Sequence, residues 1–434
     1  MPTDTSSSKT FRAPWLIFWV GFIARVLVIT LGHTYRIRPF QDHFQFGWEM
    51  GRIARALVTG YGYSDPFVGH TGPTAWVPPL YPLLMATVFK LFGVYSALSA
   101  WVLLTINSVF SAAIAIFVYQ IAARCYNRKV AIWSAWLWAL YPAAMQYAVH
   151  WVWEMSLTAM LFTWVLALAL RMRSVGESMP SPHAQSTGRW LLFGVLWGVI
   201  ALSNATLLLF LPVCGIWILL GSHKLASSMG KAALAGCLFF ACLAPWIGRN
   251  WSVFHVFIPI RGNLGAEMYA GSGPGSNGFA LMATLPLVER DPETMRYKAL
   301  GEVRYVKEQG EKAKAYLATH REHYWMISLK RFYFYWVSEP HPVEHSPVTE
   351  FGRELSYCFL SVTGCLGLAL SLKNRTPASR LFFWAFVLLP LTYYFVTVSA
   401  RFRHPLEPLI GIFSVYLFQA AEKSWRIRGF SRLR

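Results

Sequence analysis

Residues 96–123 read SALSAWVLLTINSVFSAAIAIFVYQIAA and contain no charged side chain. A helix needs about 20 apolar residues to cross the hydrocarbon core of a bilayer, so this segment is long enough to span one. Similar apolar runs recur on both sides of it, and the whole chain of 434 residues is 55% hydrophobic and only 14% charged. A soluble domain has about a quarter of its residues charged. The sequence therefore predicts an all-α, polytopic membrane protein.

Working outward from 96–123, we expect about ten transmembrane helices. The apolar block 190–221 is interrupted at Ser203 and Asn204, so we divide it into two spans, and one kinked helix is the alternative. The expected spans are 14–32, 96–123, 130–148, 152–170, 190–203, 205–221, 232–248, 353–372, 381–399 and 406–421.

The positions of the lysines and arginines predict the orientation of the chain, because short cytoplasmic loops are enriched in these residues. With a cytoplasmic N-terminus, the inner pieces are rich in basic residues and contain only three acids, Asp4, Glu177 and Glu422. Both termini are then inside, and the first apolar run is expected to be an anchor rather than a cleaved signal peptide. Because the formal net charge of +19 follows from this topology, we expect membrane lipids and no nucleic acid as partners.

Two long outer pieces follow from this orientation. The first runs from His33 to about Tyr95 and the second from about Asn250 to Phe351, and most of the acids lie in or beside them. We therefore expect the chemistry on the outer side. The predicted organisation is an N-terminal transmembrane module (1–249) that contains the first outer loop (33–95), a large outer loop with amphipathic helices (250–351) and C-terminal transmembrane helices (352–434).

The first outer loop carries a candidate catalytic carboxylate within HTYRIRPFQDHFQFGWEMGRIARALV (33–58). Asp42 precedes a helical pattern and is suited to cap that helix, and Glu49 would share roughly its face two turns later. The piece Leu80–Phe92 is short for a span, so we expect two interfacial helices in this loop. Two roles stay open for Asp42: a solvated helix cap, or a general base at the membrane boundary.

Carboxylates also occur beside the predicted spans and in the second outer loop. His150 and Glu154 are four residues apart and would face the same side of a helix, where the carboxylate is either functional or stabilised by the helix N-terminus. Arg261 and Glu267 fall in a glycine-rich, irregular stretch, which is typical both of loops that line sites and of plain connectors. Further along, Asp291 followed by proline predicts the start of a helix.

Basic residues at the outer ends of the spans run against the inside bias. They are Arg249, Arg401, Arg403 and His404. Arginine binds phosphate through two parallel hydrogen bonds, so this group predicts an anionic headgroup or phosphate ligand. Contact with ordinary anionic lipid is the alternative.

Several pieces of the chain occur in an order that resembles a known superfamily. They are Asp42 with the helix that leads to GYGYSDPF, then GPTAWVPPLYPLLMATVFKLFG, WVWEMSL, ALSNATLLLFLP, PWIGRNW and SARFRHPLEP. Together they resemble the GT-C glycosyltransferases, above all the bacterial branch (glycosyltransferase family 39) of protein O-mannosyltransferases and of the aminoarabinose transferase that modifies lipid A. The resemblance covers nearly the whole chain, but it is specific for the superfamily and not for a substrate.

The resemblance implies a GT-C-type bundle in a bacterial inner membrane, with its active site facing the periplasm. It implies a polyprenyl-phosphate sugar as donor, a lipid, glycan or protein as acceptor, and inversion at the anomeric carbon. The catalytic aspartate of the family matches Asp42, which would take the acceptor proton. Members often have two acids close together in this loop, whereas the second acid here is Glu49, seven residues away. They differ in metal dependence, so a divalent metal stays open and no other cofactor is expected.

Roles for the other charged residues follow from this chemistry. The leaving lipid phosphate gains negative charge and needs a cation nearby. Arg249 is the first candidate for that role, followed by Arg401 and Arg403. Glu154 and His150 would shape the acceptor side.

Two other functions compete with sugar transfer. A transporter or flippase for lipid-linked sugars would normally show internal repeats and substrate groups near the bilayer midplane, and neither is visible here. A glycan ligase or polymerase that uses the same lipid carriers would share the arginine and carboxylate pattern.

Overall fold

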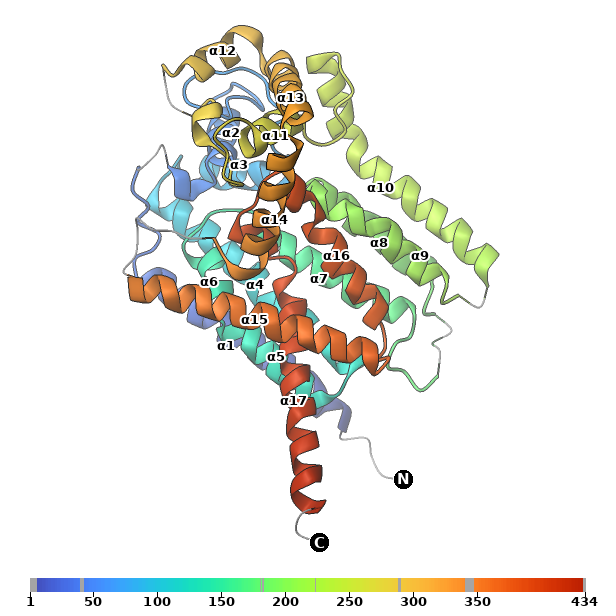
Figure 1. The fold of residues 1–434 in the computed structure, drawn as a ribbon. Helices are drawn as coiled ribbons and strands as arrows, with labels where there is room; N and C mark the ends of the chain where they lie inside the picture. The colour runs from blue at the N-terminus through green and yellow to red at the C-terminus, as the bar shows by residue number, and fades with distance from the viewer. Residues whose placement is uncertain are drawn as a thin grey trace.

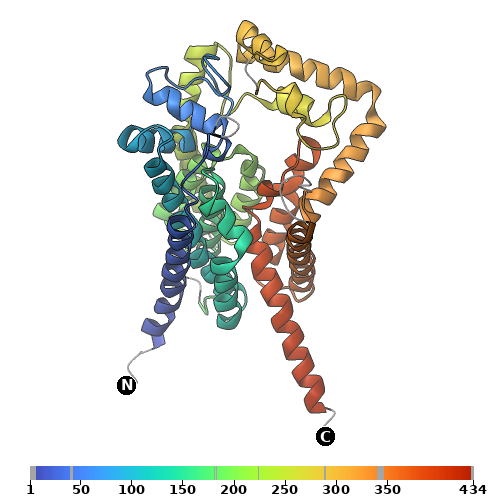
Figure 2. The same cartoon turned by 90° about the vertical axis from the view of Figure 1, so that its left-hand side faces the viewer.

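The computed structural model describes residues 6–39, 43–179, 181, 183–222, 224–287, 290–339 and 347–431. Over these ranges the chain is helical, and its single isolated β-bridge joins Ser64 to Pro73. Figures 1 and 2 show a bundle of long helices, with both termini at one end and α11–α13 at the other. The prediction of an all-α, polytopic membrane architecture is confirmed.

Each expected span coincides with one or two helices. In the described part of the chain, five helices are long and apolar enough to cross a membrane by length and composition. They are α1 (Ser6–Leu31), α4 (Ala97–Cys125), α7 (Met155–Met172), α10 (Leu225–Phe254) and α15 (Pro347–Lys373). The other spans correspond to α5 (Arg128–Leu140) with α6 (Pro142–Val149), α8 (Thr187–Ala201), η2 (Ala205–Phe210) with α9 (Leu211–Leu219), α16 (Ser379–Phe395) and α17 (Glu407–Ser431).

Two breaks in these helices have identifiable causes. Pro142 stands at the first position of α6, and because proline lacks an N–H and disfavours a helical residue before it, α5 ends at Leu140. Asn204 caps η2, and its side-chain oxygen accepts hydrogen bonds from the backbone N–H (3.1 Å) and the hydroxyl (2.6 Å) of Thr206. The predicted division of 190–221 at Ser203 and Asn204 is therefore confirmed.

A buried arginine joins three helices inside the bundle. The guanidinium of Arg25 on α1 donates to the carbonyl of Ala139 on α5 (2.7 Å) and to the hydroxyl of Ser111 on α4 (3.2 Å). An ionised side chain within an apolar bundle is tolerated where backbone carbonyls and neighbouring hydroxyls solvate it. Arg25 is therefore a structural link and not part of the outer site.

The two outer loops pack against each other above the bundle. The first loop forms η1 (Phe44–Phe46), α2 (Glu49–Val58) and α3 (Leu80–Phe92), and the second forms α11 (Leu264–Ser272), η3 (Met282–Thr284), α12 (Pro292–Leu300), α13 (Glu302–Thr319) and α14 (Arg321–Val337). Phe67 and Trp76 of the first loop share an apolar core with Tyr297 and Tyr305 of the second. This small core holds the two loops together.

The outer helices differ from the prediction at one point and agree at another. Helix α2 begins at Glu49 with Trp48 at its N-cap, so the prediction that Asp42 caps this helix and shares a face with Glu49 is wrong. The turn at Gly47, with a φ of 76°, interrupts the helical pattern. Asp42 itself lies outside the described residues. Helix α12 begins at Pro292 with Asp291 at its N-cap, as predicted.

Candidate active site

The start of the first outer loop docks onto the connection between α6 and α7. The backbone N–H of Val152 donates to the carbonyl of Gln45 at 2.9 Å, and the indole N–H of Trp153 donates to the carbonyl of Phe44 at 3.3 Å. Gly47 permits this approach, because a Cβ at that position would lie 2.8 Å from the carbonyl oxygen of Val152. These contacts bring the loop beside Glu154.

The same connection is anchored from below by a polar residue of α4. The side-chain amide of Asn107 donates to the carbonyls of Trp151 and Trp153, each at 3.2 Å, and its oxygen accepts a 3.0 Å hydrogen bond from the hydroxyl of Tyr81 on α3. Asn107 is completely buried. It therefore fixes the backbone that carries Glu154.

Glu154 immediately precedes α7, yet its side chain makes no capping hydrogen bond. Its Oε2 atom is buried and has no hydrogen-bond partner among the described residues. Burial raises the pKa of this carboxyl above its usual value, and the positive charges of Arg401 and Arg261 oppose that rise. Glu154 stands at the N-cap of α7, where the helix N-terminus favours its negative charge, and its Oε2 atom is left without a partner among the described residues.

Arg401 is the outer arginine whose hydrogen-bond donors are least occupied. It belongs to the short helix η4 (Ala400–Arg403), and its guanidinium carbon lies 3.8 Å from the ring centre of Trp153. Its Nε is buried without a hydrogen-bond partner, and no hydrogen bond from this side chain is recorded in the described part of the chain. Stacking on an aromatic face holds the group while leaving its donors available.

The second outer loop adds a further carboxylate and a further guanidinium to the candidate site. Glu267 on α11 accepts a 3.0 Å hydrogen bond from the amide of Asn263 and lies 3.8 Å from the guanidinium of Arg261. Burial is the largest influence and raises the pKa of Glu267; Arg261 and Arg401 oppose it, and Glu49 adds to it. Glu49 also raises the pKa of Glu154.

Five of the predicted site residues thus act on one another electrostatically, where the first outer loop, the start of α7, α11 and η4 meet. We call them the outer carboxylate–arginine cluster: Glu49, Glu154, Arg261, Glu267 and Arg401. Within this cluster Arg261 lies 3.8 Å from Glu267, and the positive charges of Arg261 and Arg401 oppose the raised pKa of Glu154 and Glu267. Carboxylates bind sugar hydroxyls, and guanidiniums bind phosphate.

The chain is similar to a known protein family and to several solved structures. A family model described as dolichyl-phosphate-mannose-protein mannosyltransferase matches residues 76–248. The oligosaccharyltransferase of Archaeoglobus fulgidus in its apo form is 14% identical, with a TM-score of 0.54 over 97% of this chain and 52% of that one. The family model covers less than half of the chain, and the likeness to the solved structure concerns the fold.

Two further solved structures are similar to this chain. The same archaeal enzyme tethered to an acceptor peptide with the NVT sequon is 13% identical, with a TM-score of 0.55 over 96% of this chain and 50% of that one. The chain therefore spans about half the length of these oligosaccharyltransferases, and the likeness concerns the fold. ArnT from Cupriavidus metallidurans bound to undecaprenyl phosphate is 13% identical and aligns with 96% of this chain and 78% of its own, at a TM-score of only 0.39. None of the curated proteins matches the sequence.

The guanidinium of Arg249 is occupied by hydrogen bonds that the sequence did not indicate. Its guanidinium donates to the backbone carbonyls of Thr74 and Tyr63, each at 2.6 Å, and packs over the rings of Tyr63 and Trp246. These bonds tie the first outer loop to α10. Because its donors already have partners, Arg249 is less suited to a leaving phosphate than Arg401.

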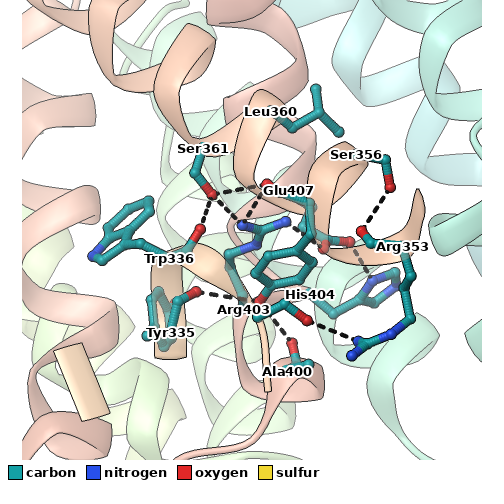
Figure 3. Close-up of polar contacts among 12 residues, drawn as sticks. Tyr335, Trp336, Arg353, Ser356, Leu360, Ser361, Ala400, Arg403, His404 and Glu407 are labelled. Atoms are coloured by element: carbon teal, nitrogen blue, oxygen red, sulfur yellow. Dashed lines mark hydrogen bonds and ion pairs between the residues drawn. The ribbon is translucent and has the colours of Figure 1, made fainter. Parts of the chain in front are cut away.

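Arg403 and His404 lie apart from Arg401 although they follow it in sequence. Both are completely buried, and Figure 3 shows them around Glu407 of α17. The carboxylate of Glu407 lies 2.9 Å from the Nδ1 of His404 and 3.3 Å from the guanidinium of Arg403, which also donates to the hydroxyl of Ser361. This network joins η4 to α15 and α17, so that of Arg401, Arg403 and His404 only Arg401 belongs to the outer carboxylate–arginine cluster.

His150 is also separated from its predicted partner. Helix α6 ends at Val149 with His150 as its C-cap, and residues 151–154 form a non-helical connection to α7. The prediction that His150 and Glu154 share one helical face is therefore wrong. No group of three His, Cys, Asp or Glu side chains that could hold a metal ion occurs among the described residues.

Some residues that build the site were missed in the sequence. Asn107 could have been found, because an amide inside an apolar span needs a polar partner. No pattern in the sequence marked Glu302. Its two carboxylate oxygens accept hydrogen bonds from the first outer loop, one from the hydroxyl of Thr74 and one from the backbone N–H of Ala75 (2.7 Å). It also accepts a 2.8 Å hydrogen bond from Tyr297. Its role depends on two loops that lie more than 200 residues apart.

Proposed function

We propose that this chain is a GT-C membrane glycosyltransferase that moves a sugar from a polyprenyl-phosphate donor to an acceptor at the outer face of the membrane. The observation that carries the proposal is the outer carboxylate–arginine cluster, in which the charge of Arg401 acts on the buried carboxyls of Glu154 and Glu267 while its guanidinium makes no hydrogen bond to the described residues. The GT-C fold and the family match over 76–248 agree with it.

Arg401 is proposed to receive the departing lipid phosphate. When the bond between the anomeric carbon and the phosphate oxygen breaks, the electron pair stays on that oxygen and its negative charge grows. The donor phosphodiester already carries one negative charge, and a preorganised guanidinium stabilises the additional charge of the transition state more than it stabilises this ground state, which accelerates the step. Arg261 lies in the same cluster and supplies a second positive charge.

Asp42 is proposed as the general base. Its carboxylate would take the proton of the acceptor hydroxyl while the hydroxyl oxygen forms its bond to the anomeric carbon, and attack opposite the phosphate would invert that carbon. This assignment rests on the family resemblance and on chain continuity, since the segment that begins at His43 docks onto Val152 and Trp153 beside Glu154.

The glutamates of the cluster are proposed to bind sugar or acceptor hydroxyls. Because burial raises the pKa of both Glu154 and Glu267, each can keep its proton closer to neutral pH than an exposed glutamate. A protonated carboxyl donates one hydrogen bond and accepts others, which suits a hydroxyl group. Glu49 increases this tendency by adding a third negative charge.

The outer location follows from the charge bias of the sequence. Both termini lie at the end of the bundle away from α11–α13, and the short connections near that end carry the excess of lysine and arginine. A cytoplasmic N-terminus then places the cluster outside, which in a bacterium is the periplasmic side of the inner membrane. The acceptor would be a lipid, a glycan or a protein.

A reconstituted transfer assay tests the proposal. The purified chain is incubated with a panel of undecaprenyl-phosphate sugars and a membrane-lipid extract as the source of acceptor hydroxyls, and release of free undecaprenyl phosphate is followed by mass spectrometry. We expect release with at least one donor, loss of release in Asp42→Asn, and normal release in Arg304→Gln, which alters an exposed residue of α13. Movement of an intact donor between leaflets without release would instead identify a flippase. Unchanged release in Asp42→Asn would remove Asp42 as the base.

A further inference from the structure

A second polar cavity lies on the first outer loop, and none of its lining residues belongs to the outer carboxylate–arginine cluster. Its volume is about 330 Å³, within the range of small-molecule sites. The cavity is formed by the last turn of α2 and the chain that follows it. Its lining residues are Arg55, Ala56, Thr59, Tyr61, Asp65, Gly69 and His70.

The floor of the cavity is a fixed turn built around Asp65. One carboxylate oxygen accepts the backbone N–H groups of Thr71 (2.8 Å) and Gly72 (2.9 Å), and the other lies 3.0 Å from the Nδ1 of His70. The side chain of Asp65 is only 6% exposed. Its negative charge is thus satisfied within the turn, and it orients the ring of His70, whose centre lies 4.2 Å from that of Tyr61.

Arg55, which lines this cavity, and Lys298, which lies against its lining residue Gly69, have no such partner among the described residues. The guanidinium of Arg55 on α2 makes no recorded hydrogen bond or ion pair with the described residues, and its single ring contact is with Tyr95, at 6.0 Å. The exposed Lys298 on α12 places its Nζ 3.0 Å from the point that a Cβ on Gly69 would occupy, and it too lacks a recorded acceptor there. Both α2 and α12 lie above the bundle in Figure 1.

We propose that this cavity binds a phosphate monoester, carried either by a sugar or by a lipid headgroup. The two unmatched positive charges of Arg55 and Lys298 equal the charge of a phosphate dianion, whereas a carboxylate would neutralise only one of them. Arg55 supplies donors in a fork that fits phosphate oxygens, and Lys298 supplies a mobile point charge. The exposed face of Tyr61 gives a sugar ring a surface to stack on.

This site is separate from the proposed sugar transfer, so it can be tested without turnover. The full-length protein in a neutral detergent is titrated with glucose 6-phosphate and, as the uncharged control, with glucose, and heat is measured by calorimetry. We expect binding of glucose 6-phosphate only. Arg55→Gln and Lys298→Gln should each weaken it by about tenfold, because each removes a charge-assisted hydrogen bond.

Matched variants serve as controls for the titration with glucose 6-phosphate. Arg304→Gln and Lys307→Gln remove exposed cations of α13 and should bind like the wild type. Since Lys298 is exposed, Lys298→Gln decides the question if Arg55→Gln fails to fold. Binding that survives both cavity substitutions, or that is absent from the wild type, overturns the proposal.

A second arm separates the two sources of the phosphate. The protein is placed in nanodiscs of phosphatidylcholine with or without phosphatidic acid, whose headgroup is a phosphate monoester, and the titration is repeated. Weaker binding of glucose 6-phosphate in the presence of phosphatidic acid supports a lipid headgroup that reaches the cavity. Unchanged binding supports a soluble or glycan-borne phosphate.

Discussion

Replacement of Arg401 by glutamine separates chemistry from folding at the candidate site. The wild-type guanidinium stacks at 3.8 Å on Trp153 and has no recorded hydrogen bond within the described residues, so the fold loses only a cation–π contact of about 0.5–2 kcal/mol. The leaving phosphate loses a preorganised positive charge, and removal of one such group lowers kcat by about 10²–10³-fold. We therefore expect a large loss of rate with a nearly normal thermal unfolding midpoint.

Arg249→Gln is the matched comparison. This arginine donates two 2.6 Å hydrogen bonds to backbone carbonyls that would be left without their donors. Loss of a hydrogen bond to a charged group costs about 1.5–3 kcal/mol, so Arg249→Gln should lower the unfolding midpoint far more than Arg401→Gln. Both variants are measured in the same detergent, by release of undecaprenyl phosphate and by thermal unfolding. Retention of kcat within about threefold in Arg401→Gln would refute the assigned role of this residue, since the expected loss is at least about 10²-fold.

Three further predictions concern the frame of the site. Asn107→Ala should destabilise the fold by about 1–2 kcal/mol and lower kcat by about tenfold or more, because the backbone before Glu154 loses its anchor; Ser108→Ala, whose hydroxyl bonds only within α4, should leave kcat unchanged. Gly47→Ala should cost about 1–3 kcal/mol in thermal unfolding, since its φ is 76° and the added Cβ meets the carbonyl of Val152; wild-type stability would contradict the docking described here. The pKa of Glu154 is raised in the folded state, so the stability that this group contributes is complete below its ordinary pKa of 4.5 and is lost as the pH rises through the raised value. The unfolding midpoint of Glu154→Gln should therefore depend less on pH above 4.5 than that of the wild type, and parallel curves would argue against the raised pKa.

The spans could be predicted because each has a local cause. Hydrocarbon thickness sets the length of an apolar helix, and Pro142 and Asn204 interrupt the runs in which they stand. The outer loops were harder, because propensity favours a helix from Asp42 onward, whereas the close contact of Gly47 with Val152 stops it and delays the helix until Glu49. That contact lies about 100 residues away in sequence and leaves no local pattern.

The residues of the candidate site could likewise be predicted only in part. Charged residues at the outer ends of apolar spans and in the outer loop call for a functional explanation. Composition and spacing were enough to select four of them: Glu154, Glu267, Arg261 and Arg401. They could not separate Arg401 from Arg403, two residues later, because both are arginines in one short segment. Glu407 and Ser361 engage Arg403 inside the bundle, and the ring of Trp153 holds Arg401 toward the carboxylates.

The sequence by itself determined that this chain crosses a membrane many times and which charged residues need a functional explanation, and it predicts which end faces the cytoplasm. Those properties depend on apolar length and on the position of lysine and arginine, and both are written along the chain. Only the tertiary structure decided which arginine is available to a ligand, since that depends on which backbone carbonyls and carboxylates lie within hydrogen-bond reach. Arg249 lies against Tyr63 and Thr74 and is engaged, whereas Arg401 lies on an aromatic ring and is free.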